Sequence, residues 1–257
     1  MNVAFAASEG GIAIHLSAPV LGYVFGIPVT STLLMTWFVI VLLTIFSFFM
    51  YRSLKMVPGK LQVIVETLVG GAFDYIADAL ESRELAKKYF PLIMTIFIFI
   101  LTLNWVGLLP GVDAIGIFGT MHGEKALIPF LHPANTDLNI TISLAAIAFF
   151  AIEIIGIFTL GFFKYMGKFI NFSSPLNFLI GIIELFSELA RLVSFSFRLF
   201  GNIFAGKTLL LIAMFFVPFV LPVPILGFEM FVGLIQAFIF AVLTLFFIKL
   251  AIAEPEH

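Results

Sequence analysis

One segment constrains this chain more than any other: residues 176–217 are mostly apolar and contain no proline, although Pro175 and Pro218 bracket them. At about 1.5 Å per residue, a single helix over this segment would be roughly 60 Å long. The hydrocarbon core of a bilayer is only about 30 Å thick, so such a helix cannot cross upright. It folds back as a hairpin or crosses with a strong tilt. Because no internal proline, Asn-Gly pair or charge cluster marks a reversal, we favour the tilt.

The remaining apolar runs point to the same class of protein. The chain is 62% hydrophobic and 11% charged, which exceeds the apolar content of an ordinary soluble core. We predict an all-α integral membrane protein with five membrane helices, the last two long and tilted, in one membrane domain (32–257) after an external amino-terminal segment (1–31). The predicted spans are 32–50, 90–109, 140–163, 176–217 and 225–252.

Lysine and arginine in short loops predict the orientation, because they accumulate on the cytoplasmic side. The external segment 110–136 carries only Lys125 of these residues, and residues 1–31 carry none. The amino terminus is therefore expected outside and the carboxyl terminus in the cytoplasm. The predicted cytoplasmic positive charges are Arg52, Lys55, Lys60, Arg83, Lys87, Lys88, Lys164 and Lys168.

Residues 58–81 are apolar but interrupted by charges at helical spacing, which is typical of an amphipathic helix. We expect this helix to lie along the cytoplasmic membrane surface, either as a simple anchor or with a partner. Its apolar face comprises Leu61, Ile64, Val65, Leu68, Ala72, Ile76 and Ala79, and its polar face Gln62, Glu66, Asp74 and Asp78.

Charged residues inside the long segment 176–217 suggest a function. Each costs at least about 2.5 kcal/mol at the bilayer centre on insertion scales. At about 100° per residue, six neighbours fall within roughly 40° of Arg198 and form one polar stripe. These are Glu184, Ser187, Arg191, Ser194, Asn202 and Ala205.

The last span adds a second stripe, because Glu229 and Gln236 are seven residues apart and share a helix face. Two such stripes indicate an ion path, or a set of hydrogen bonds that hold the helices together. For Asn202 and Gln236 both interpretations stay open. Arg198 lies too far from either bracketing proline to reach a membrane surface, which favours function there. Glu188 and Arg191 are interpreted as an ordinary interfacial ion pair.

Residues 201–208 match the phosphate-binding pattern G-x-x-x-x-G-K-[ST]. A phosphate site also needs a strand before the loop and a later aspartate for Mg²⁺, and no aspartate follows Thr208. We therefore expect no nucleotide at this position. Gly201 and Gly206 are interpreted instead as small residues that let helices approach closely.

Four sequence blocks occur in the order expected of one family. The blocks "LNWVGLLPG" (103–111), "ANTDLNITISLA" (134–145), "SFRLFGNIFAGK" (196–207) and "LIQAFIFAVLTLFFI" (234–248) resemble subunit a of F-type ATP synthase. The resemblance implies a stator against which a ring of c subunits turns, with two half-channels for ions. It also implies contacts with peripheral-stalk b subunits and other synthase subunits, a bacterial plasma membrane location, and no cofactor or catalysis by this chain alone.

The resemblance assigns roles to individual residues. It identifies Arg198 with the family's essential arginine, Asn202 with a neighbouring asparagine, Gln236 with a channel glutamine and Glu184 with a cytoplasmic-side glutamate, and Ser187 and Ser194 lie on the same stripe. Two positions depart from the family, which often has an acid or histidine where Lys207 stands and a histidine where Glu229 stands. A Lys207–Glu229 pair would remove the free acid from the outer half-channel. Either H⁺ or Na⁺ is compatible with the resemblance.

Other function classes are less compatible with the sequence. A stand-alone ion transporter would use internal repeats, and no repeat is visible. A membrane scaffold would tolerate loss of Arg198. An intramembrane enzyme lacks candidates, because the chain has no cysteine and no H-E-x-x-H pattern. The four histidines lie outside the spans and are expected to be solvated loop residues: His15, His122, His132 and His257.

Overall fold

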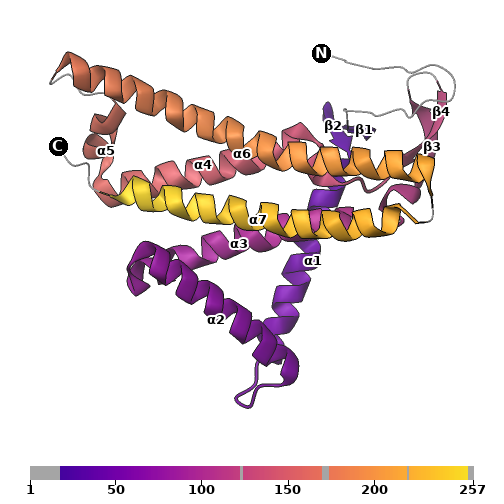
Figure 1. Ribbon diagram of the computed structural model, residues 1–257, viewed down its shortest axis with the longest axis horizontal. Helices are drawn as coiled ribbons and strands as arrows, with labels where there is room; N and C mark the ends of the chain where they lie inside the picture. The colour runs from indigo at the N-terminus through magenta and orange to yellow at the C-terminus, as the bar shows by residue number, and fades with distance from the viewer. Residues whose placement is uncertain (1–17, 122–123, 170–173, 219, 254–257) are drawn as a thin grey trace. The chain divides into compact units, whose positions relative to one another are not determined.

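A computed structural model describes residues 18–121, 124–169, 174–218 and 220–253 (Figure 1). Within them, five helices are long and apolar enough to cross a membrane. They are α1 (Ser31–Ser53), α3 (Arg83–Gly107), α4 (Leu138–Leu160), α6 (Pro175–Phe216) and α7 (Pro222–Ile252). The predicted all-α class with five long apolar helices is confirmed.

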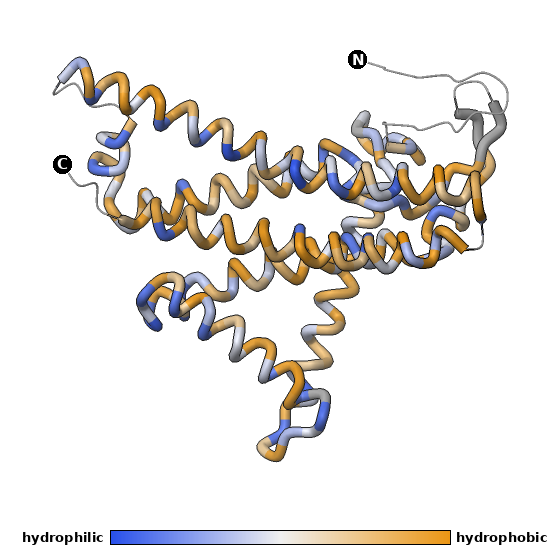
Figure 2. The backbone as a smooth tube through the Cα atoms, viewed as in Figure 1, coloured by the Kyte–Doolittle hydropathy of each residue, from blue (hydrophilic) through white to orange (hydrophobic). Residues whose placement is uncertain are grey.

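Helix α6 is continuous, so the hairpin alternative for this segment is wrong. It begins at Pro175, where a proline fits because the first helical N–H needs no partner within the helix. It ends at Phe216, two residues before Pro218. Figure 2 shows hydrophilic positions recurring along α6 between hydrophobic ones. The charges therefore lie on one uninterrupted helix.

Two shorter helices complete the helical part. Helix α2 (Lys60–Leu80) is the predicted amphipathic helix. Helix α5 (Phe162–Phe169) follows directly after α4. The predicted third span continued to residue 163, but α4 ends at Leu160 because Gly161 adopts a φ of 85°, a left-handed conformation that stops the helix.

Two antiparallel hairpins were not predicted from the sequence. Strands β1 (Val20–Val24) and β2 (Ile27–Thr30) are joined by Phe25 and Gly26, which both have positive φ as a tight hairpin turn requires. Strands β3 (Gly116–Met121) and β4 (Glu124–Pro129) pair from Gly116 with Pro129 onward. The second hairpin belongs to the α3–α4 connection, which also contains the 3₁₀ helices η1 (Val112–Ala114) and η2 (Ala134–Thr136).

The chain divides into two compact units, and each long helix contributes to both. The first unit comprises Met1–Ile40, Phe99–Ala145 and Val193–Ala237. The second comprises Val41–Ile98, Ala146–Leu192 and Phe238–His257.

Buried polar contacts organise the first unit around the start of α1. The Thr32 hydroxyl is fully buried and donates to Oδ2 of Asp137 at 2.8 Å. The other oxygen of Asp137 accepts from the backbone N–H of Asn139 at 3.0 Å and so caps α4. The Ser31 hydroxyl donates to the carbonyl of Pro129 at the end of β4. The connection between α3 and α4 is thereby tied to the first turn of α1.

An apolar core organises the second unit. The carboxyl-terminal half of α2 supplies Ile76 and Leu80, which are 3% and 5% exposed. The amino-terminal half leaves Ile64 and Leu68 56% and 68% exposed. The predicted apolar face of α2 is thus only partly covered within this unit. The other buried members of the core are Ala77, Ala86, Tyr89, Ile93, Ile152, Tyr165, Phe169, Ala241, Leu245, Ile248 and Ala251.

Candidate functional site

Arg198 lies near the middle of α6 and is partly exposed. Its Nη2 donates to the Ser194 hydroxyl at 3.3 Å, one turn earlier. One turn later, Nδ2 of Asn202 donates to the Arg198 carbonyl at 2.9 Å. Among the residues that the structure describes, no carboxylate lies within ion-pair distance of Arg198. This guanidinium therefore has no counter-ion in the described part of its own chain.

The predicted stripe divides into residues that face outward and residues that are paired. Ser187 and Ser194 are exposed, and Arg198 and Asn202 are partly so. Arg191 instead turns inward, with its side chain only 13% exposed.

The partners of Arg191 lie in the second unit. Its Nη1 lies 2.6 Å from Oε2 of Glu188, and its guanidinium carbon is 3.7 Å from the centroid of the Phe247 ring. The predicted Glu188–Arg191 ion pair is formed, and it is buried within the chain, since Glu188 is 3% exposed. Glu184 pairs with Lys168 of α5 at 2.9 Å.

Glu153 and Tyr165 join this region of the second unit and were missed by the sequence analysis. The Tyr165 hydroxyl donates to Oε2 of Glu153 at 3.0 Å, and its ring packs against Gly156, where a Cβ would clash with it. Burial, followed by the charge of Glu153, raises the pKa of Tyr165 well above its usual value. A cavity of about 360 Å³ adjoins Tyr165, Lys168, Glu184 and Arg191. Glu153 stands inside the predicted third span, so the rule that identified Arg198 could have found it.

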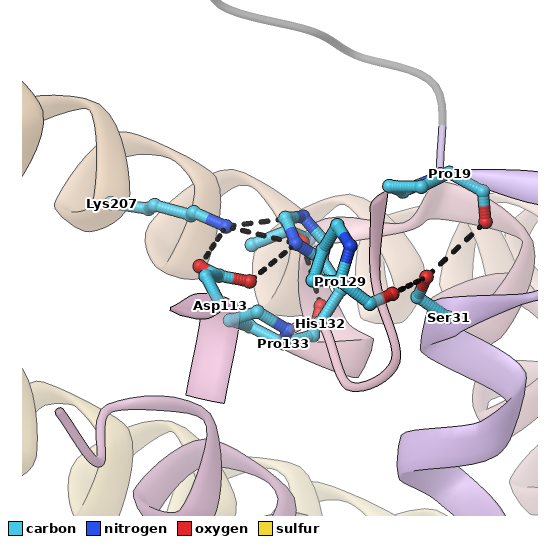
Figure 3. Close-up of polar contacts among 8 residues, drawn as sticks. Pro19, Ser31, Asp113, Pro129, His132, Pro133 and Lys207 are labelled. Carbon is cyan, nitrogen blue, oxygen red and sulfur yellow. Dashed lines mark hydrogen bonds and ion pairs between the residues drawn. The ribbon is translucent and has the colours of Figure 1, made fainter. Parts of the chain in front are cut away.

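Lys207 pairs with Asp113 in the first unit, as Figure 3 shows. Its ammonium is 3.0 Å from Oδ2 of Asp113 and 3.1 Å from Nε2 of His132. Nδ1 of His132 is in turn 2.7 Å from Oδ1 of Asp113. The Lys207–Glu229 pair suggested by the sequence is therefore not formed, because the Lys207 ammonium pairs with Asp113 instead.

His132 is partly buried, with its side chain 20% exposed, so the expectation that it is a solvated loop residue is wrong. His15, His122 and His257 lie outside the described residues. Burial raises the pKa of Asp113, but the hydrogen bond with His132 and the charge of Lys207 outweigh it and leave that pKa below its ordinary value. No sequence signal singled out Asp113, which lies in the 3₁₀ helix η1.

Glu229 occupies a different environment in the first unit. It is 4% exposed, and its carboxyl group fills the space where a side chain at Gly206 would begin. The described residues provide it with no hydrogen bond or ion pair. Gly206 thus has the close contact expected of a small residue, whereas nothing lies within 4 Å of a Cβ built at Gly201. Residues 201–208 form two turns of α6 rather than a phosphate-binding loop.

A buried amide cluster and a cavity lie in the same unit. Nδ2 of Asn104 donates to the Gly233 carbonyl at 2.9 Å, and Nδ2 of Asn135 donates to Oδ1 of Asn104 at 2.6 Å. The cavity, about 430 Å³, is bordered by Asn104, Asn135, Asp113 and Lys207. Asn104 was missed although it interrupts a predicted span. Oε1 of Gln236, on α7, is buried without a hydrogen-bond partner in the described part of the chain.

The arrangement combines an uncompensated guanidinium on one helix with an isolated carboxyl group on the next. Such groups attract and hold ions of opposite charge, and a fixed guanidinium does so without losing its own proton. Within the described ranges, no group of three or more His, Asp or Glu side chains is placed to hold a metal ion. The Arg198 guanidinium and the Glu229 carboxyl group can attract ions of opposite charge and repel ions of like charge.

Comparison with known proteins identifies the family of this chain. Residues 33–249 match the family model of the ATP synthase A chain. ATP synthase subunit a of Campylobacter curvus is 35% identical over 80% of this chain and 83% of its own length. The sodium ion specific subunit a of Propionigenium modestum is 34% identical over 91% of this chain and 78% of its own. Subunit a of Campylobacter hominis is 32% identical over 92% and 96%. The chain belongs to the ATP synthase A chain family, the multi-pass membrane subunit a.

Proposed function

We propose that this chain is the ion-translocating stator subunit of a rotary ATP synthase and that Arg198 faces the ring of c subunits. The observation that carries the proposal is the missing counter-ion of Arg198. A guanidinium in a long apolar helix is costly unless an opposite charge reaches it. In the proposed complex, the carboxylate of each passing c subunit supplies that charge.

Arg198 works by electrostatics in this mechanism. Because its guanidinium does not deprotonate in a protein, it attracts each c-subunit carboxylate in the ionised form. Its positive charge also repels a cation that would pass directly from one half-channel to the other. Ring rotation is then the remaining route. Moving one unit charge through 100 mV supplies about 2.3 kcal/mol, so several steps are summed for each ATP.

The two half-channels are assigned from the positions of polar residues along α6 and α7. Glu229 and Gln236 line the outer half-channel, because α7 begins on the external side in the predicted orientation. Glu184 lies at the cytoplasmic end of α6 and lines the inner half-channel. Ser187, Ser194 and Asn202 form the polar surface that faces the c ring. Both H⁺ and Na⁺ remain compatible with these groups.

The membrane placement follows from the same reasoning. The chain lies in the bacterial plasma membrane with its amino terminus outside and its carboxyl terminus in the cytoplasm. Helices α6 and α7 cross with a tilt, since α6 is longer than the bilayer is thick. Helix α2 lies along the cytoplasmic surface, where its exposed Ile64 and Leu68 meet lipid or the peripheral-stalk b subunits.

The test compares Arg198→Ala and Arg198→Lys in the complete complex, reconstituted in vesicles with an imposed ion gradient and potential. Arg198→Ala should abolish ATP synthesis, because it removes the charge barrier. Arg198→Lys should impair synthesis severely, because an ammonium lacks the planar fork and loses its proton more readily when desolvated. Near-normal synthesis by assembled Arg198→Ala complex would refute the mechanism and favour a scaffold role.

A further inference from the structure

We propose that Asp113 is a positioning residue that holds the Lys207 ammonium away from the Glu229 carboxyl group. Glu229 is thereby kept as a free acid in the outer half-channel. The inference rests on the proposed function and concerns only groups of the first unit. It explains how this chain keeps a usable acid although a lysine lies one residue from the glycine that Glu229 touches.

The contacts of Lys207 support the proposal that Asp113 holds its ammonium in place. Both carboxylate oxygens of Asp113 are engaged, Oδ2 by Lys207 at 3.0 Å and Oδ1 by His132 at 2.7 Å. Because Nε2 of His132 also lies 3.1 Å from Nζ of Lys207, the three groups form a closed triangle. Figure 3 shows Lys207 extending from α6 toward the other two residues, which belong to the α3–α4 connection.

Glu229 is the candidate competing partner for Lys207. The Glu229 carboxyl group touches Gly206, which directly precedes Lys207, and consecutive Cα atoms are about 3.8 Å apart. The ammonium of lysine is carried on a flexible four-carbon chain. Glu229 is buried and has no cationic partner in the part of the chain that the structure describes, so attraction to a nearby ammonium would be strong. Asp113 is the group that competes with it.

Loss of the Asp113 charge should therefore redirect Lys207 to Glu229. The resulting ion pair would occupy the carboxylate and make it unavailable to a passing ion. If the pair is favoured by about 1.4 kcal/mol, it forms in roughly nine of ten molecules, which corresponds to about a tenfold loss of free Glu229.

A purely structural role for Asp113, as an anchor of the α3–α4 connection, makes a different prediction. If Asp113 only anchors the connection, Asp113→Asn should reduce activity whether or not Lys207 is charged. If Asp113 holds the Lys207 ammonium away from Glu229, Asp113→Asn should have no effect once Lys207 is replaced by a neutral residue. The two roles are separated by combining Asp113→Asn with Lys207→Gln in a double-mutant cycle.

The experiment uses the complete synthase in vesicles and measures ion-driven ATP synthesis for D113N, K207Q and D113N/K207Q. Asp78→Asn serves as the matched control, because Asp78 is an exposed aspartate on α2. Carbodiimide labelling of Glu229, detected by mass spectrometry, gives a readout that does not depend on rotation. Arg198→Ala in the same series tests the proposed function separately.

We expect D113N to lose about tenfold in synthesis rate and to label less at Glu229, and D113N/K207Q to recover both. D78N should match the unaltered complex. A D113N complex with normal synthesis, or a double variant as slow as D113N, would overturn the proposal while leaving the Arg198 mechanism intact. Should D113N fail to assemble, K207Q and D113N/K207Q are compared instead. Equal rates are then expected, and a slower double variant would contradict the inference.

Discussion

The guanidinium carbon of Arg191 lies 3.7 Å from the centroid of the Phe247 ring, and its Nη1 pairs with the buried Glu188. By helical spacing, Arg191 shares a stripe of α6 with Arg198, which has no carboxylate partner among the described residues. Two arginines seven residues apart on one helix are therefore used differently. Arg191 is compensated within the chain, whereas Arg198 has no compensating carboxylate among the described residues.

Removing Arg191 should destabilise the subunit rather than abolish coupling directly. Arg191→Gln leaves the Glu188 carboxylate buried without its counter-ion, which costs about 3 kcal/mol for a buried pair. Glu188→Gln in the same chain should recover much of the loss, because the uncompensated charge disappears. Thermal unfolding of the detergent-purified complex measures both effects. An equal decrease in melting temperature for Arg191→Gln and for the Arg191→Gln/Glu188→Gln double variant would contradict this account.

The outward part of the stripe should contact the c ring. Cysteines that replace Ser194 and Asn202 are expected to form crosslinks with cysteines in the c subunit, because Ser194 is exposed and Asn202 partly so. Ser196 provides the control, since it is 1% exposed and lies 3.2 Å from Thr141 inside the first unit. Labelling of positions 194 and 202 by lipid-phase probes, without c-ring crosslinks, would rule out the proposed interface.

The lack of a side chain at Gly206 should be required for the Glu229 carboxyl group to occupy its position. Gly206→Ala places a methyl group where the Glu229 carboxyl group now lies, so one of them must move and ion-driven synthesis should fall. Gly227→Ala is the matched control on α7, because nothing lies within 4 Å of a Cβ at that position. The rates are compared in reconstituted vesicles at equal assembly. Similar rates for the two variants would show that the Glu229 site adapts to the extra methyl group.

The stabilisation that the charge of Asp113 provides should be lost only in acid. The partners of Asp113 leave its pKa below the ordinary value of 3.8, after burial is offset by His132 and Lys207. A lowered carboxyl pKa means that the stabilisation is complete above pH 3.8 and is lost as the pH falls through the folded-state value. The difference in melting temperature between unaltered and D113N complex should therefore grow as the pH rises from about 3 to 5. A difference that shrinks as the pH rises would contradict this sign.

Much of the architecture was accessible from the sequence because it depends on local periodicity and on the cost of burying charge. The absence of proline, of an Asn-Gly pair and of a charge cluster between Pro175 and Pro218 favoured one long helix, and α6 is that helix. The spacing of Arg198, Ser194 and Asn202 places them on one face of any α-helix. The free-energy cost of a charged side chain inside a membrane helix likewise identifies Glu229 as a candidate functional residue.

Which carboxylate pairs with Lys207 was decided only by the tertiary structure. Lys207 follows Arg198 by nine residues, so at about 100° per residue it lies on the opposite side of α6. This angle does not tell whether Glu229 or Asp113 pairs with it there. The α3–α4 connection determines the outcome by bringing Asp113 and His132 to Lys207. Long flexible side chains pair with whichever opposite charge the fold brings near, and a loop's path depends on distant contacts such as that between Thr32 and Asp137. Periodicity along one helix carries no information about those contacts.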